Sequence, residues 1–554
     1  MNDIWFDDIQ SKLMLTVGER QAIAQWLMAK LTGPEPKAAW PERLQVEERP
    51  RLVFLSLSDG RRPATVYQGS GLGLYAATLA ALEQAQAQSV VADLRYCKID
   101  VVQSAIACER LNTPRPFKHD RSLYGLAYDR DSQIALLPEE LVGQELLDAE
   151  QRLDAERLAR YLQARPFQAE AWAHLRAASR LTFYRFACTS FATDGRDTWL
   201  LYRGHRCFNA IAPSDLLAAA QRGGSYLRRH QTSAGQFTYC YLGSRDRVTI
   251  GYNLLRHAGA VSALLDLYEV TGELAFLDSA QGGIDYLLAF SQPSLLAPEV
   301  GCCIVENGLA KLGATALAVM ALAKYTLLTR QPHYQPQLLQ LARHLQAAQQ
   351  PSGAFLMHRQ AYPSGEDTSF VSQRYPSQAL LALLYVYRVT QRESWLERAA
   401  ASAHYLLAIA KRQRPVREDD WLLQGLSELS RDRPHPDYQH QATRIALAIL
   451  SHQHSGEPQP DYLGSFGDPP RAKTTAAHLE GLCAAYAFTV GNANSNTHDQ
   501  DALWLASRFL LQLQCEPETV MYLPNPQRAR DGFREQLTDF TTRLDDVYRT
   551  ITGL

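Results

Sequence analysis

The sequence predicts a mainly α-helical protein, an (α/α)6 toroid built as a closed ring of helix pairs and preceded by a small α+β domain. The first observation is that long apolar helical segments come in pairs, one pair about every 50 to 70 residues. The second is a copied ending, because residues 226–237 and 344–355 both close on Gln-x-x-x-Gly-x-Phe. The third is a change of pattern near residue 165. We therefore expect an α+β domain at 1–165, a bridging segment at 166–212 and the toroid at 213–554.

The α+β domain is predicted from short apolar runs separated by turn residues. Alanine and leucine favour helices, β-branched residues favour strands, and proline is tolerated in the first helical turn. In chain order we expect a helix at 16–30, strands at 52–58 and 64–68, a helix at 72–88, strands at 90–102, 123–128 and 133–137 with a turn at 129–132, and a short helix from Pro138. The bridging segment should add a helix at 171–177 and strands at 181–191 and 198–202.

Twelve helices are expected in the toroid, and they alternate in character. Every second segment is rich in alanine, leucine and glycine, so that it can pack closely within an inner ring, whereas the others are amphipathic and suit an outer ring. An open α-solenoid is the alternative. Six pairs without a polar capping repeat favour closure. The expected helix starts are Ser214, Asn253, Leu274, Leu309, Pro336, Pro376, Ser394, Asp420, Asp437, Lys473, Asp499 and Thr538.

Composition excludes several classes of function. The net charge of −2 leaves no basic surface for nucleic acid or an anionic membrane. The acidic N-terminus lacks the pattern of a secretory signal, and the longest apolar helix, at 312–328, is too short and too interrupted to span a bilayer. None of the nine cysteines forms Cys-x-x-Cys, so free thiols in a reducing cytoplasm are expected. We expect no metal, because His452, His454, Cys302 and Cys303 lack zinc spacing.

Three segments carry a family resemblance. They are Tyr-Asn-Leu-Leu-Arg-His-Ala-Gly at 252–259, Tyr-Pro-Ser-Gln-Ala-Leu at 375–380 and Gly-Phe-Arg-Glu-Gln-Leu-Thr-Asp at 532–539. They resemble six-hairpin toroid proteins, which include sugar epimerases of the N-acylglucosamine 2-epimerase type, uronyl epimerases, glycoside hydrolases and polysaccharide lyases. The resemblance implies the toroid fold for 213–554 and leaves the reaction open, since this architecture supports many. The N-terminal domain shows no resemblance.

Two other patterns are weaker. The Gln-x-x-x-Gly-x-Phe endings also resemble the repeated motifs of squalene-cyclase-like toroids, but Arg417 stands where the first aspartate of the cyclase acid motif belongs. Residues 69–74, Gly-Ser-Gly-Leu-Gly-Leu, suggest a dinucleotide loop. The third glycine of that motif is missing and no long parallel βαβ unit follows, so a plain turn is expected and no cofactor is predicted.

The candidate site is predicted at the rim where the inner helices begin, because polar residues at those starts should converge. Asp419 and Asp420 are the first candidates for acid and base, with Trp421 as a stacking surface for a sugar ring. Helix capping is the alternative for the two aspartates. His257 is a candidate base and Arg256 a carboxylate binder, with a hydrogen-bonded core histidine as the alternative.

The remaining candidates have less specific roles. Glu306 is either an acid or a helix cap. Glu480 lies in an alanine-rich helix, where a carboxylate needs a partner such as Lys473 or His478. Arg543, Asp545 and Asp546 are expected to form an ion-pair clasp between the last and first helix pairs. The substrate-binding set is completed by Tyr252, Asn253, Arg374 and Tyr375.

Two functions follow from these candidates. The first is an intracellular carbohydrate-active protein that acts on a sugar or a uronic-acid-containing oligosaccharide by acid/base catalysis in the toroid funnel. The second is a non-catalytic scaffold that binds a glycan or a peptide within a polysaccharide-assembly or modification system. A protein partner of the N-terminal domain is possible in either case. Terpene or peptide-modifying chemistry is a third class.

Overall fold

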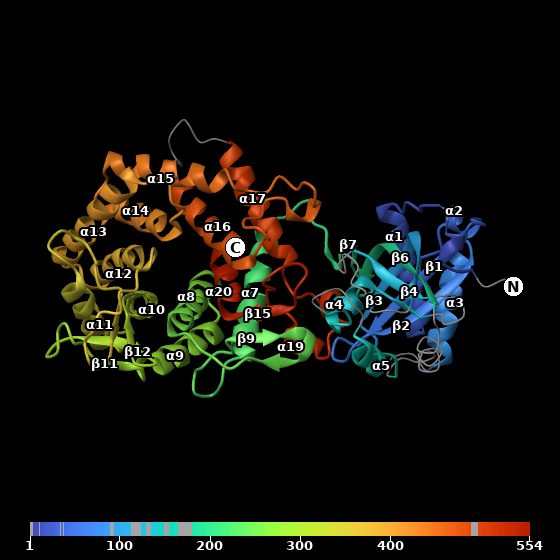
Figure 1. Cartoon of the computed structure of the whole chain (residues 1–554), viewed down its shortest axis with the longest axis horizontal. Helices are drawn as coiled ribbons and strands as arrows, with labels where there is room; N and C mark the ends of the chain where they lie inside the picture. The colour runs from blue at the N-terminus through green and yellow to red at the C-terminus, as the bar shows by residue number, and fades with distance from the viewer. Residues whose placement is uncertain are drawn as a thin grey trace.

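The computed structural model confirms the predicted fold class. It describes residues 4–9, 11–33, 35–36, 38–88, 93–111, 123–128, 134–148, 154–163, 180–488 and 497–554. Figure 1 shows two lobes, a ring of helices formed by the C-terminal part of the chain and a β-sheet with flanking helices formed by the N-terminal part. The expected turn at 129–132 and the expected helix at 171–177 lie outside the described residues.

The N-terminal lobe is one antiparallel sheet with helices packed on it. Strand β3 lies at its centre and pairs with β1 on one side and with β6 on the other. The strand order is β2-β1-β3-β6-β4-β5, and β7 and β8 extend from β6. The elements are α1 (Val17–Thr32), α2 (Glu42–Gln45), β1 (Pro50–Ser58), β2 (Thr65–Leu72), α3 (Leu74–Ala87), β3 (Tyr96–Leu111), β4 (Gly125–Tyr128), β5 (Ala135–Leu136), α4 (Pro138–Gly143), α5 (Ala155–Gln163), β6 (Arg180–Thr193), β7 (Thr198–Tyr202) and β8 (His205–Arg206).

Local chemistry explains these elements. Helix α1 begins with a capping box, in which Thr16 accepts a hydrogen bond from the Glu19 backbone, and it ends at Gly33 in a left-handed conformation. Every residue of β1 after Pro50 is buried, because the strand lies inside the sheet and is covered by α3. Strands β6 to β8 belong to the same sheet as β1, although they fall in the predicted bridging segment 166–212. The division at residues 165 and 212 stays a prediction.

The ring is closed by contacts between its inner helices. In the described part of the chain, α8, α10, α12, α14, α16 and α20 each contact the next, and α20 contacts both α16 and α8. The inner helices are α8 (Leu254–Thr271), α10 (Leu312–Thr329), α12 (Tyr375–Thr390), α14 (Asp420–Asp432), α16 (Ala472–Tyr486) and α20 (Leu544–Gly553). The outer helices are α7 (Pro213–Arg229), α9 (Leu274–Leu288), α11 (Gln335–Ala348), α13 (Glu393–Arg412), α15 (Pro436–Leu450) and α17 (Thr497–Gln512).

Small residues let the inner helices approach one another. Gly259 of α8 lies against the ring of Tyr548, and Gly313 of α10 lies against the ring of Tyr375, so an added Cβ would collide with either ring. Helix α10 is long and apolar enough to cross a membrane, but 72% of that stretch is buried inside the structure. Its place in the inner ring, between α8 and α12, accounts for its composition.

The copied ending of the sequence forms a repeated corner. Gln231 bridges to Phe237 and Gln349 bridges to Phe355, and the glycine between them has φ of +89° at Gly235 and +88° at Gly353. Each glutamine side chain donates to a backbone carbonyl of the next outer helix, Ser279 O in α9 at 2.9 Å and Arg398 O in α13 at 2.8 Å. The corner therefore joins successive outer helices.

Two further corners have the same construction without the same sequence. After α15, Gln453 donates to Ala502 O of α17 at 2.9 Å, and Gly464 takes the left-handed position at φ +85°. After α17, Gln514 donates to Ala219 O of α7 at 3.0 Å, and Asp531 takes the left-handed position at φ +71°. This last contact joins the final outer helix to the first, so the outer ring is also tied at its closure.

Candidate functional site

The starts of several inner helices meet at one rim, as the sequence predicts. Arg256 in the first turn of α8 and Lys473 near the start of α16 both contact Asp545 at the start of α20. Arg374, just before α12, contacts Asp420, the first residue of α14. The rim therefore gathers charged side chains that are up to about 290 residues apart in the sequence.

The first group at this rim is a pair of buried carboxyls, Asp545 and Asp546. Asp545 is 2% exposed, and its oxygens lie 3.2 Å from Arg256 Nε, 3.1 Å from Lys473 Nζ and 3.7 Å from Arg543 Nε. Asp546 is equally buried, and its Oδ2 accepts no hydrogen bond from the described residues. Burial, together with the neighbouring Asp545, raises the pKa of Asp546 well above its usual range. The pair thus combines a carboxyl surrounded by three cations with a carboxyl whose protonated form is favoured by burial.

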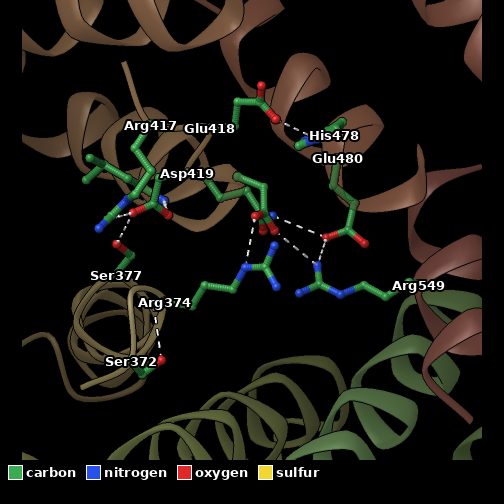
Figure 2. Close-up of polar contacts among 12 residues, drawn as sticks. Ser372, Arg374, Ser377, Arg417, Glu418, Asp419, His478, Glu480 and Arg549 are labelled. Atoms are coloured by element: carbon green, nitrogen blue, oxygen red, sulfur yellow. Dashed lines mark hydrogen bonds and ion pairs between the residues drawn. The ribbon is translucent and has the colours of Figure 1, made fainter. Parts of the chain in front are cut away.

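The second group is centred on Arg549, which lies one turn beyond Asp545 on α20 (Figure 2). Its Nη1 lies 2.6 Å from Glu480 Oε2 and 3.6 Å from Asp420 Oδ2, and its guanidinium stacks 4.5 Å from the centre of the Trp421 ring. Asp420 is fully buried and lies 3.5 Å from Arg374 Nε. Neither of its oxygens accepts a hydrogen bond within the described residues. Burial raises the pKa of Glu480.

The two groups form one continuous polar cluster. Asp545 and Arg549 are one turn apart on α20, whereas Lys473 and Glu480 are about two turns apart on α16, and α16 and α20 pack together. We call these residues the rim cluster: Arg256, Arg374, Asp420, Trp421, Lys473, Glu480, Arg543, Asp545, Asp546 and Arg549. The acids lie beneath, and the more exposed members are Lys473, Arg374, Arg543 and Arg256. A ligand that approaches the rim therefore meets cations before carboxyls.

Asp419 does not belong to this cluster, although it precedes Asp420. It is the N-cap of α14, and its Oδ1 accepts from the backbone of Leu422 at 3.0 Å. Its Oδ2 accepts from Ser377 at 3.0 Å and also from Arg417. Both oxygens are occupied, so the prediction of Asp419 as a catalytic acid or base is corrected: it is a helix cap, the alternative that the sequence left open. Burial raises the pKa of its carboxyl.

His257 and Tyr252 are structural, which corrects their predicted roles. His257 is fully buried; its Nε2 lies 2.7 Å from Gly283 O of α9 and its Nδ1 lies 2.7 Å from the Tyr252 hydroxyl. The Tyr252 hydroxyl also accepts from the Phe237 backbone at 3.0 Å. Burial lowers the pKa of His257 to about 4. The ring joins α8 to α9 and to the corner after α7, and it has no free nitrogen to act as a base.

Glu306 and Asn253 both serve the start of α8. Glu306 Oε1 accepts from the Leu254 backbone at 2.7 Å, and Oε2 accepts from Lys311 at 2.5 Å. Asn253 is the N-cap and accepts from the Arg256 backbone. These contacts occupy both oxygens of Glu306, so its predicted catalytic role is corrected to that of a cap. Tyr375 packs on Gly313 rather than standing free as a stacking surface.

Arg549 was not predicted as a member of the site, and Asp546 was predicted only as part of an ion-pair clasp. The sequence does place Arg549 near the site, since it lies four residues after Asp545 on a short final helix and so shares a face with it. Trp421 was identified, but its ring is covered by the Arg549 guanidinium. His478 contacts Glu418 at 3.0 Å rather than Glu480. No group of three or more His, Cys, Asp or Glu able to hold a metal ion occurs in the described residues.

Comparisons with known proteins identify similar folds. No family model and no curated protein matches the sequence. An inactive variant of an α-1,6-mannanase from a Salegentibacter species, solved with α-1,6-mannotriose, is 11% identical with a TM-score of 0.44 over 61% of this chain and 97% of its own. A D-mannose isomerase is 13% identical with a TM-score of 0.46 over 63% and 98%.

A cellobiose 2-epimerase from Bacillus thermoamylovorans is also similar, at 13% identity with a TM-score of 0.42 over 53% of this chain and 86% of its own. The assignment of this chain to the (α/α)6 toroids rests on its own closed ring of inner helices.

Proposed function

We propose that this protein acts on a carbohydrate at the rim cluster by acid/base catalysis. The observation that carries the proposal is that four carboxyls from α14, α16 and α20, three of them buried and Glu480 nearly so, lie in different electrostatic surroundings. Burial raises the pKa of Glu480 and of Asp546, whereas Asp420 and Asp545 face arginine and lysine side chains. Carboxyls in unlike surroundings are the means by which one site supplies both an acid and a base.

The roles follow from the contacts. Asp546 is the acid, because burial raises the pKa of its carboxyl and its Oδ2 has no hydrogen-bond donor in the described part of the chain. Asp420 is the candidate base, because it lies between the guanidiniums of Arg374 and Arg549. The arginines and the lysine at the rim hold hydroxyl or carboxylate groups of the sugar in place. A proton delivered from Asp546 to a leaving oxygen, or to a ring atom, is the step that this arrangement supports.

A test combines a glycan panel with matched variants. The panel contains neutral and uronate-containing oligosaccharides, and NMR follows both bond cleavage and inversion at ring carbons. For a substrate that turns over, Asp546→Asn and Asp420→Asn should lower kcat by about 10²-fold or more. Asp437→Asn, a change at an exposed acid on α15, is the control and should leave kcat unchanged. Full activity of both rim variants, each shown to be folded, would reject the site.

A non-catalytic glycan-binding scaffold is the second candidate, and one observation favours it. Asp420, Asp545 and Asp546 are each 2% exposed or less, so the cluster is covered by its own arginines and lysine. Binding of one glycan without turnover of any member of the panel would establish the scaffold. A cytoplasmic location and a protein partner for the N-terminal lobe belong to the proposal in either form.

A further inference from the structure

A separate cavity lies in the wall of the ring. It has a volume of about 270 Å³ and lies between the outer helices α13 and α15, behind the starts of α12 and α14. This volume is close to the lower end of the range of about 300–1,000 Å³ that is usual for small-molecule sites. The lining comes from the segments between α11 and α12 and between α13 and α14, and from helices α12 to α15.

The lining is more apolar than the rim cluster. Ten of its 17 residues are apolar, seven of these aliphatic, and the other seven are polar or charged, among them Gln373, Gln413 and Gln441. Three of the lining residues are also exposed: Leu356 at 64%, Val371 at 74% and Ile409 at 38%. Single exposed apolar residues are ordinary, but three that surround one hollow mark a surface that binds an apolar group.

A basic segment adjoins the cavity. Residues 411–417 read Lys-Arg-Gln-Arg-Pro-Val-Arg, so four cations lie at and just beyond the end of α13. Arg412 and Arg414 are exposed, and Arg414 donates back to the carbonyl of Gln413, which itself lines the cavity. Two of these four cations are paired, Arg417 with the buried Asp419 and Lys411 with Asp437. Arg412 and Arg414 leave a net positive charge at the mouth.

We propose that this cavity binds a small anionic amphiphile, with a short aliphatic chain between α13 and α15 and a negatively charged head at the 411–417 segment. The chain replaces water against the apolar side chains of the lining, and burial of each CH₂ favours binding. The head gains charge-assisted contacts with guanidiniums. The small volume suits one chain rather than a lipid held in a bilayer. The inference does not depend on the function proposed for the rim cluster.

Calorimetry with soluble decanoate, below its micelle concentration, tests the proposal. One site should be saturated, decanol should bind at least about tenfold more weakly, and Ala410→Phe, which fills the cavity, should abolish binding. Ala408→Phe, on the exposed face of the same helix, is the matched control and should bind normally. Because Ala410→Phe can also disturb packing, Ile409→Ser at an exposed position provides a second variant, which should weaken binding several-fold.

A double variant tests whether the 411–417 segment binds the charged head. The double change Arg412→Ser and Arg414→Ser should weaken decanoate binding about five- to tenfold and leave decanol unaffected. Equal binding of decanoate and decanol, normal binding by both cavity variants, or no binding of decanoate at all would each overturn the proposal. Binding to anionic vesicles without binding of soluble decanoate would overturn it in favour of a membrane surface.

Discussion

At the scale of single residues, Arg549 stabilises the rim cluster. Its guanidinium contacts Glu480 and Asp420 and covers Trp421, all within the inner ring. Removing one partner of a buried ion pair leaves the other charge unsolvated, at a cost of about 3–5 kcal/mol. Arg549→Met should therefore lower the free energy of unfolding by about this amount in urea denaturation at pH 7.

A surface pair supplies the control for this prediction. Arg433 contacts Glu393 where both side chains are exposed, and exposed pairs contribute about 0–1 kcal/mol. Arg433→Met should thus have little effect. If the two variants lost equal stability, Arg549 would not be the partner that offsets the buried charge of Asp420 and Glu480.

Histidine burial makes stability depend on pH. Burial lowers the pKa of His257 to about 4, whereas the unfolded chain titrates near 6.5. The folded state then binds fewer protons than the unfolded state between these values, so stability is full above about pH 6.5 and falls as the pH drops toward 4. The loss due to His257 is up to about 3 kcal/mol.

His257→Gln isolates this contribution. The variant removes the titrating group, so its free energy of unfolding should fall less steeply between pH 7 and pH 4.5 than that of the wild type. His344, which is buried against Ser294 and has a similarly low pKa of about 4, remains as a second source of the same slope. Identical slopes for wild type and variant would contradict the neutral, buried state assigned to His257.

The sequence predicted that polar residues at the starts of the inner helices converge, and the structure brings Asp420, Arg374 and Lys473 to one rim. Their role in a functional site stays a prediction. His257 and Glu306 were assigned incorrectly, because a polar residue at such a start also satisfies backbone groups at helix ends. The choice between capping and catalysis depends on hydrogen-bond partners in other elements, and one sequence does not show them.

At the scale of elements, the corner glycines are the most constrained positions in the repeat. A Cβ on Gly353 would lie 2.2 Å from the carbonyl oxygen of Ala401, and a Cβ on Gly235 would lie 2.0 Å from that of Gly282. Gly353→Ala should therefore cost clearly more than the roughly 1 kcal/mol expected for a positive φ alone. Thermal or urea unfolding measures the difference.

Gly272 is the matched control. It ends α8 with φ of +70°, and a Cβ there would meet nothing within 4 Å. Gly272→Ala should thus report only the backbone penalty of about 1 kcal/mol. A loss of stability at Gly353 no greater than at Gly272 would show that the two outer helices separate easily at the corner.

Most element boundaries were predictable because each has a local cause. Proline, aspartate and asparagine mark the starts of α12, α14 and α8, and the observed starts lie within about three residues of the expected ones, except at α20. That helix begins at Leu544 rather than Thr538, because Thr541–Arg543 forms a strand that pairs with residues 240–242. The pairing partner is about 300 residues away, so no local pattern reveals it.

At the scale of the whole molecule, the toroid was predictable and its attachment to the sheet lobe was not. A repeat imposes the ring, since each helix pair must cover the apolar face of the next. The contact between the lobes instead joins residues far apart in the sequence: Met521 and Tyr522 pack into the core beside the sheet, and ion pairs add to this contact. Arg206 of β8 lies 2.6 Å from Glu518 of α18 (Pro517–Val520), and Arg203 lies 3.3 Å from Asp461.

The Arg206–Glu518 pair should therefore couple the stability of the two lobes. Glu518 is 1% exposed, and Arg206 also stacks 3.8 Å from the centre of the Trp199 ring. Arg206→Met leaves Glu518 buried without its partner and should cost about 3–5 kcal/mol, whereas the double variant Arg206→Met with Glu518→Leu should recover much of that loss. Amide hydrogen exchange in β1 and in α8 measures the two lobes separately.

If the two lobes unfold together, Arg206→Met should accelerate amide hydrogen exchange in both β1 and α8, because one unfolding event exposes both elements. Acceleration in β1 alone would show that the toroid remains folded without the sheet, and the two lobes would then be independent. The double variant distinguishes loss of the pair from loss of packing: if it is no more stable than Arg206→Met, the cost comes from the Trp199 stack and not from the unpaired carboxylate of Glu518.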